Sequence, residues 1–282
     1  TIPGPSLTLT ESTILAGTDA KKGVPVQIES VRGVHEVVIY RIENGSEVEA
    51  LRETKNGEHT LNYAPEIDFT EATSKLKVVV SDGREGKEAI GYMKAYVNMD
   101  VATLNVGSQP LANNAHVKYP DAFGMVSLND LKTYSVDYAI ANEVNAKNVD
   151  FKFYCFGASG SPRLYSMDNT GKDGEFSGST GKLSAIKVKN LTRFAILSNF
   201  DYENATVASI SSEILSSSIA QSLLDPIAVG NVIAFRTGGS SAAGGGRIGV
   251  MKVINITEPK ELVSNNATAR VMTVEIKFPK KK

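Results

Sequence analysis

Short β-rich segments separated by turn dipeptides fill the first hundred residues of this 282-residue chain. Segments rich in Val, Ile, Tyr and Thr predict strands at residues 24–30, 35–42, 46–52, 59–64, 75–82 and 88–97. The breaks between them carry Arg32-Gly33, Asn44-Gly45, Asn56-Gly57 and Asp82-Gly83, dipeptides that hairpin and loop turns favour. Six or seven short strands in about 95 residues indicate an immunoglobulin-like β-sandwich.

The pattern changes after Asn98, so we expect two domains: residues 1–98, with an N-terminal tether, and a larger β-rich domain over 99–282. In the second domain, helical spacing of apolar residues predicts two helices, at 135–147 capped by Ser135 and at 210–225 capped by Ser211 or Ser212. Strands are expected at 148–157, around 163–167, and at 182–190, 192–198, 229–237, 247–257 and 269–278. The predicted fold class is therefore mainly β: an immunoglobulin-like sandwich followed by a larger β-sandwich-type domain with one or two short helices.

Charge and cysteine content exclude several function classes. The net charge is −1, from 30 basic and 31 acidic residues that are interspersed along the chain, so no nucleic-acid footprint is present. The single cysteine, Cys155, lies in an apolar segment and is expected to be a small buried residue. His35, His59 and His116 lack metal-ligand spacing. We therefore expect no metal and no cofactor.

Two glycine-containing segments resemble ligand-binding motifs. Gly244, Gly246 and Gly249 match the dinucleotide pattern G-x-G-x-x-G, but a strand-like segment follows them where a helix is required. We interpret this segment as a hairpin loop. The segment DNTGKDGE (168–175) approaches a calcium loop, yet Lys172 falls at a ligand position. A turn is the favoured interpretation there, and a looser calcium site is the alternative.

A family resemblance appears in the second domain. The segments VDFKFYCFG, Ser161-Pro162, VGNVIAFRTGG, RIGVMKVINI and MTVEIKF occur in an order that resembles the C-terminal region of cell-envelope lipoproteins of Gram-negative gut anaerobes, in which an immunoglobulin-like domain comes first. The resemblance covers most of 135–278 and, more loosely, 24–97. It implies a location in the bacterial envelope, at the outer-membrane surface or in the periplasm, and membrane contact only through an N-terminal lipid anchor that has been removed. It brings no catalytic residues.

Three functions follow as hypotheses. The first is a non-enzymatic adhesion or scaffolding protein that binds a surface glycan or a protein. The alternative is a glycan-binding accessory protein of a polysaccharide-utilisation system, for which exposed tyrosine rings with Asp or Asn at their edges are needed because the chain has no Trp. An enzyme acting on glycosides requires a cleft with two carboxylates. The long 157–182 loop is the expected binding segment, with the ligand-binding candidates Arg163, Tyr165, Asp168 and Asn169.

Overall fold

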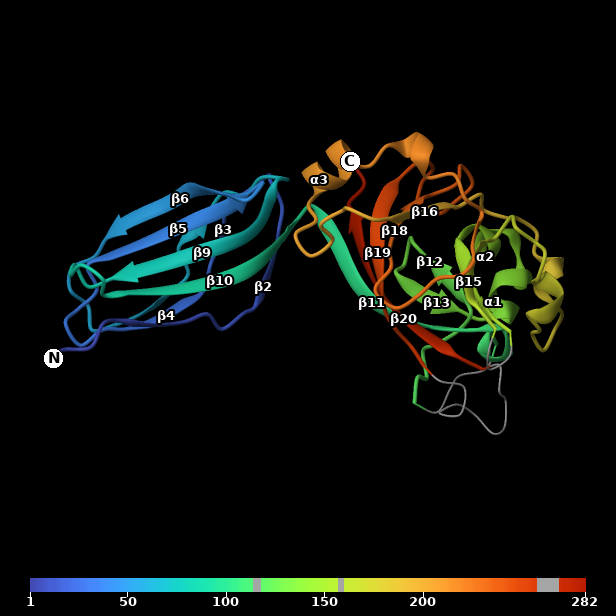
Figure 1. Cartoon of the computed structure of the whole chain (residues 1–282), viewed down its shortest axis with the longest axis horizontal. Coiled ribbons are helices and arrows are strands. Elements are labelled where there is room, and N and C mark those ends of the chain that lie inside the picture. The colour runs from blue at the N-terminus through green and yellow to red at the C-terminus, as the bar shows by residue number, and fades with distance from the viewer. Residues whose placement is uncertain (114–117, 157–159, 258–268) are drawn as a thin grey trace. The chain divides into compact units, whose positions relative to one another are not determined.

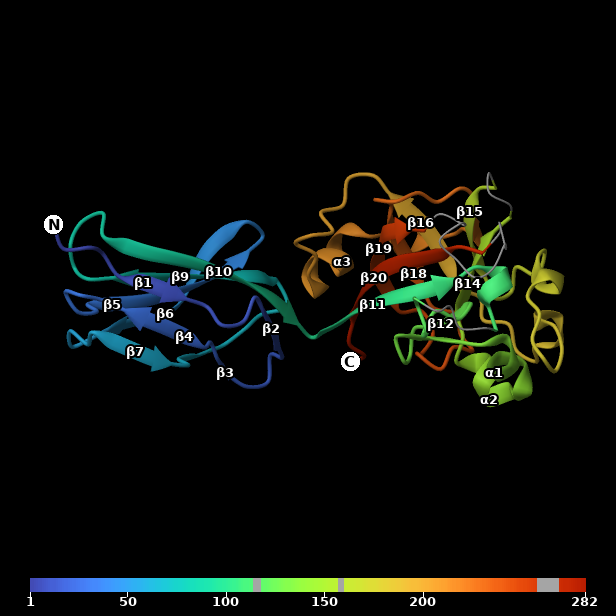
Figure 2. The ribbon, with the colours of Figure 1, turned by 90° about the horizontal axis from the view of Figure 1, so that it is seen from below.

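The computed structural model describes residues 1–113, 118–156, 160–257 and 269–282. The described chain is mainly β with a few short helices, as the sequence predicts, and none of these helices is long and apolar enough to span a membrane. It divides into two compact units (Figures 1 and 2). The smaller unit contains Thr1–Asp100, Glu203–Ser209 and Pro279–Lys282, and the larger unit contains Val101–Tyr202 and Ile210–Phe278. The first break therefore falls close to the expected boundary, and two later segments belong to the smaller unit.

The smaller unit is a β-sandwich. One sheet has the strand order β2-β10-β9-β5-β6, a second has the order β1-β4-β7, and β3 pairs with β8. Ile28, Ile39 and Val78 are fully buried in one apolar core formed by residues of both main sheets. The strands are β1 (Ser6–Thr8), β2 (Thr13–Ala16), β3 (Lys22–Gly23), β4 (Val26–Glu29), β5 (Glu36–Glu43), β6 (Ser46–Thr54), β7 (Thr60–Tyr63), β8 (Glu66–Ile67), β9 (Thr73–Ser81) and β10 (Glu88–Val97).

The predicted Asn44-Gly45 turn joins β5 to β6. Glu43 pairs with Ser46 across the ladder, so the connection has two residues. Asn44 has φ 53° and Gly45 has φ 80°, and positive φ at both central residues matches the twist of a type I′ hairpin. The turn prediction is confirmed.

The larger unit contains two five-stranded sheets, with the orders β11-β20-β19-β18-β16 and β13-β12-β14-β15-β17. Phenylalanines from both sheets, including Phe151, Phe153 and Phe235, belong to one buried core. The strands are β11 (Met99–Gly107), β12 (Met125–Ser127), β13 (Lys132–Tyr134), β14 (Phe151–Cys155), β15 (Pro162–Ser166), β16 (Arg193–Leu197), β17 (Leu223–Leu224), β18 (Val232–Arg236), β19 (Ile248–Ile256) and β20 (Val271–Pro279).

A helical layer covers the other face of the second sheet. Val136, Ala139 and Ala146 of the helices form a second buried core with Tyr154 and Tyr165 of the sheet. The helical segments of the chain are α1 (Val136–Ala141), α2 (Glu143–Lys147), α3 (Val207–Glu213) and the 3₁₀ turns η1 (Gln109–Leu111), η2 (Asp173–Glu175), η3 (Leu183–Ala185) and η4 (Ser216–Ser218).

Strand pairing joins the two sheets of the larger unit along one side. Phe194 of β16 exchanges backbone hydrogen bonds of 2.8 and 3.0 Å with Gln221, and β17, two residues later, pairs with β15. On the other side β11 and β13 are each the terminal strand of their sheet among the described strands. The sandwich is therefore closed by hydrogen bonds at one edge and ends in two strand edges at the other.

The helix expected at 135–147 is two helices. Ser135 caps α1 as predicted, since its hydroxyl accepts a hydrogen bond from the Tyr138 amide. The backbone of Asn142 is extended, and its side chain accepts from the Asn145 amide and begins α2. An Asn in this position stops one helix and starts the next because its short side chain competes for backbone groups.

Two other expectations were wrong. The strand at 182–190 is absent from the described structure, because Leu183 and Ile186 are both buried at a spacing of three that suits the 3₁₀ turn η3. The helix at 210–225 ends at Glu213. The hydroxyl of Thr206 accepts from the Ser209 amide, so the helix begins before Ser211 and Ser212. Leu223 and Leu224 pair with β15 instead.

A buried ion pair holds the helical layer against the second sheet. Lys152 of β14 is fully buried, and its ammonium lies 2.6 Å from an Asp173 carboxylate oxygen. It also donates to the carbonyls of Ser166, at 3.4 Å, and Asn169, at 3.0 Å. The buried ammonium thus donates hydrogen bonds to two carbonyls, and the Asp173 carboxylate balances its charge as an ion-pair partner. Burial lowers the pKa of Lys152.

A second buried charge lies at the end of the sandwich. The carboxylate of Asp150 accepts hydrogen bonds from the Leu128 amide at 2.7 Å and from the Ser241 hydroxyl at 2.6 Å. Burial raises the pKa of this carboxyl to about 6. The folded protein therefore binds the proton of this carboxyl more tightly than the unfolded chain does.

We expect Lys152→Met to lower the free energy of unfolding by about 3–5 kcal/mol, because Asp173 then keeps a buried charge without its partner. Adding Asp173→Asn removes that charge and recovers part of the loss. Urea unfolding of the full chain measures both values. Lys172→Met, on a partly exposed neighbour, is the control and is expected to change stability by about 0.5 kcal/mol or less. A loss below about 1 kcal/mol for Lys152→Met, as at an exposed pair, contradicts the buried pair.

The raised pKa of Asp150 predicts a pH dependence of stability. Below about pH 4 the carboxyl is protonated in both the folded and the unfolded chain, and between about pH 4 and 6 only the folded chain keeps the proton. The free energy of unfolding should therefore fall by about 3 kcal/mol across this window as the pH rises. Asp150→Asn should flatten this part of the profile, measured as the difference between variant and wild type. If the free energies of unfolding of the variant and of the wild type changed in parallel with pH, the raised pKa of Asp150 would be contradicted.

Candidate functional site

The four expected ligand-binding residues lie on and just after β15. The guanidinium of Arg163 is 3.1 Å from Asp225, and it donates to the Tyr165 hydroxyl at 3.1 Å. Tyr165 is only 4 % exposed. Asp168 accepts two hydrogen bonds of 2.9 Å from Arg193, and the amide of Asn169 donates to Ser222 at 3.0 Å. The polar groups of all four residues therefore bind other parts of the chain.

The glycine motif is a hairpin loop, as predicted. Its first two glycines lie between β18 and β19, and Gly249 lies inside β19. A Cβ atom at Gly249 would be 2.3 Å from the Phe235 ring, so this glycine is required for close packing. Cys155 is fully buried in the core, as predicted, and burial raises its pKa.

No group of three or more potential metal ligands forms among the described residues. In the calcium-like segment, Asp168 pairs with Arg193 and Asp173 with Lys152. His116 lies outside the described residues.

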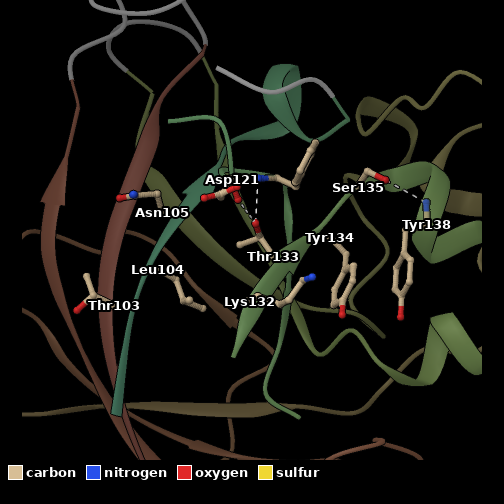
Figure 3. A pocket seen from close by; sticks show the side chains of 10 residues that line it. Thr103, Leu104, Asn105, Asp121, Lys132, Thr133, Tyr134, Ser135 and Tyr138 are labelled. Carbon is tan, nitrogen blue, oxygen red and sulfur yellow. Dashed lines mark hydrogen bonds between the residues drawn. The ribbon is translucent and has the colours of Figure 1, made fainter. Parts of the chain in front are cut away.

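A pocket of about 620 Å³ lies between the terminal strands β11 and β13 (Figure 3). This volume is within the range of small-ligand pockets. The lining residues are Thr103, Leu104, Asn105, Asp121, Phe123, Lys132, Thr133, Tyr134, Ser135 and Tyr138. Asp121 is the one carboxylate among them, so the lining does not contain the acid pair that glycoside hydrolysis needs.

The strand edges themselves form the pocket walls. Three consecutive residues of β11 and three of β13 line it. Successive side chains of a strand point to opposite faces, so consecutive residues line one pocket only where the edge of the strand faces it. Leu104 belongs to the core between the sheets, while Thr103 is exposed. The backbone edges of two sheets therefore face the same space.

Two stacked tyrosines form part of the second wall. The ring centroids of Tyr134 and Tyr138 are 3.9 Å apart with an interplanar angle of 15°. Lys132 lies on the other side of Tyr134, with its ammonium 4.7 Å from the ring centroid (Figure 3). The Tyr134 hydroxyl donates to Asp130, and Asn148 donates to the Tyr138 hydroxyl at 3.0 Å. Burial raises the pKa of Tyr134, and the hydrogen bonds from Tyr134 and Asn148 lower the pKa of Asp130.

One threonine holds the pocket floor in place. The hydroxyl of Thr133 donates to the Asp121 carbonyl and accepts from the Phe123 amide at 3.0 Å. The Phe123 carbonyl in turn accepts from the Gly107 amide at 3.0 Å. The 121–123 segment therefore connects the end of β11 to β13 and closes the gap at that end.

The sequence pattern of β11, one wall of this pocket, is that of a strand, although we predicted no strand there. We expected no strand between residues 99 and 134, where the structure has β11, β12 and β13. Ala102, Leu104 and Val106 alternate with polar or small residues and face the core, which is the pattern of a half-buried strand. The pairing of edges across the pocket is non-local and has no signal in a single sequence.

We expect Thr133→Val to lower the free energy of unfolding by about 1–3 kcal/mol, because valine keeps the shape but removes two hydrogen bonds at a buried position. Thr103→Val changes an exposed residue of the same pocket and should leave stability within about 0.5 kcal/mol of the wild type. Urea unfolding measures both variants. Equal stabilities for the two would show that Thr133 does not hold the floor.

Comparison with protein-family models and with curated proteins finds no match to this chain. The functional assignment therefore depends on the geometry of the pocket and of the surfaces around it.

Proposed function

We propose that this chain is a non-enzymatic adhesion or scaffolding protein of a bacterial cell envelope, and that its larger unit captures an extended segment of a partner protein in the pocket between β11 and β13. The envelope location is supported by the sequence resemblance over 135–278. The binding mode is supported by the structure of the pocket.

The observation that carries this proposal is that two terminal strands turn their edges toward one pocket. An edge strand presents unpaired backbone N–H and C=O groups, to which an extended peptide adds as a further strand. Residues 101–107 of β11 contain no charged residue and no proline, the features that usually prevent such pairing. A peptide added to β11 would extend the first sheet toward β13.

The covered ring of Tyr134 favours a peptide over a sugar. A sugar stacks on the open face of a ring. Tyr134 has Tyr138 on one face and the Lys132 ammonium on the other. The main-chain groups of a peptide need no open ring face, because they bind the strand edge.

Panning a random linear-peptide library against the full chain tests the proposal. We expect enriched peptides to protect backbone amides of residues 101–106 from hydrogen exchange. Thr103→Lys should weaken their binding at least about tenfold, since a lysine on an edge strand opposes pairing. Thr103→Val should leave affinity unchanged, because recognition uses the main chain. Ile196→Lys, on the terminal strand β16 of the same sheet, is the matched control and should also bind normally.

Two results would contradict strand addition. One is a library that yields no binding peptide. The other is a set of peptides whose binding survives Thr103→Lys and whose protected amides lie outside β11.

A further inference from the structure

The backbone groups of β11 point alternately to its two edges. The Gly107 amide donates to the Phe123 carbonyl at 3.0 Å, whereas the amide of the following residue donates at 2.8 Å to the carbonyl that precedes β20, on the opposite edge. Neighbouring residues of a strand direct their N–H and C=O groups to opposite edges. The backbone groups of Thr103 and Asn105 therefore share the direction of the Gly107 amide and face the pocket that both residues line.

The pocket is closed where β11 ends. A Cβ atom at residue 107 would lie 2.7 Å from the Ala122 carbonyl oxygen, so the chain packs directly against the backbone of Gly107. The Gly107 amide is itself bound to Phe123. A strand that pairs with Thr103 and Asn105 therefore cannot continue along β11 past Gly107. This geometry suits a partner segment whose chain ends beside Gly107.

One carboxylate lies at this closed end. Asp121 belongs to the segment that contacts Gly107, and Figure 3 shows it beside Thr133. Its side chain is exposed and has no hydrogen bond or ion pair to another described residue. Lys132, the one cationic side chain among the lining residues, lies instead over the ring of Tyr134. The closed end of the pocket is therefore negative.

Backbone donors at the closed end are already engaged. The amides of residues 122, 123 and 124 each donate to another group of the chain, at 3.0, 3.0 and 3.3 Å. A terminal carboxylate needs free N–H donors or a cation, whereas an ammonium group needs acceptors. The closed end thus offers an acceptor to an amino terminus and repels a carboxyl terminus.

We propose that this pocket binds the free amino terminus of a partner protein. The first residues of the partner run antiparallel to β11 and pair with the backbone of Asn105 and then with that of Thr103. The α-ammonium group of the partner forms a charge-assisted hydrogen bond with the Asp121 carboxylate. This binding mode rests on the strand addition proposed above and specifies which part of a partner binds and in which direction.

Peptides with defined ends test the proposal. A random library displayed with free amino termini is panned against the full chain, and enriched sequences are synthesised and measured by titration calorimetry. We expect acetylation of the amino terminus, or its extension by two residues, to weaken binding at least about tenfold, because the ammonium group is lost or displaced from Asp121. Amidation of the carboxyl terminus, or a two-residue extension there, should leave affinity unchanged.

Asp121→Asn is the matching change in the protein. It should weaken binding of the free peptide at least about threefold and leave binding of the acetylated peptide unchanged. The melting temperature should not change, because the pocket floor uses the Asp121 carbonyl and not its carboxylate. Asp100→Asn removes an exposed carboxylate from the start of β11 and is the matched control, with unchanged affinity for both peptides.

Any of three results would overturn the proposal: equal binding of free and acetylated peptides, tolerance of the extension at the amino terminus, or equal affinity of the wild type and Asp121→Asn for the free peptide. If Thr103→Lys still weakens binding in such a case, strand addition stands and only the inserted amino terminus is wrong. A library that yields no binding peptide overturns both.

Discussion

The ammonium of Lys152 holds the helical layer of the larger unit against its second sheet. An apolar side chain at this position could fill the space, but it could not bind two backbone carbonyls and a carboxylate from one segment of the chain. The contact fixes the end of β15 and the start of η2, which would otherwise be a long surface loop. Lys152 binds the carbonyl of Ser166, and the hydroxyl of Ser166 accepts a hydrogen bond from the Thr192 amide. The same contact thus helps place β16, which closes the sandwich.

This closure determines which strand edges of the larger unit lie beside the pocket. Backbone hydrogen bonds between Phe194 and Gln221 join the two sheets on one side. On the other side, hydrogen bonds through Gly107, Phe123 and Thr133 connect the sheets at one end. The first side is occupied by the protein's own strands, whereas on the second side β11 and β13, which are terminal among the described strands, lie beside the pocket. The proposed binding site is thus a consequence of topology more than of any local motif.

The sequence predicted what local chemistry determines. The Asn44-Gly45 hairpin, the Ser135 cap and the glycine loop before Gly249 depend on neighbouring residues, and all three are found. The element at Leu223–Leu224 was missed because its pairing with β15 overrides a helical spacing of apolar residues. The sequence did not predict the pocket, because its walls are some thirty residues apart in the chain and only the tertiary fold brings them together. Arg163 and Asp168 looked available in the sequence, but ion pairs with Asp225 and Arg193 engage them.

Terminal strands of the two units differ in a way that bears on function. In β6, at the edge of the smaller unit's sheet, Glu47, Glu49 and Arg52 supply charges that discourage edge-to-edge pairing. Residues 101–107 of β11 supply none. A chain that protects one edge with charges and leaves another uncharged beside a pocket has a reason to keep the second edge available.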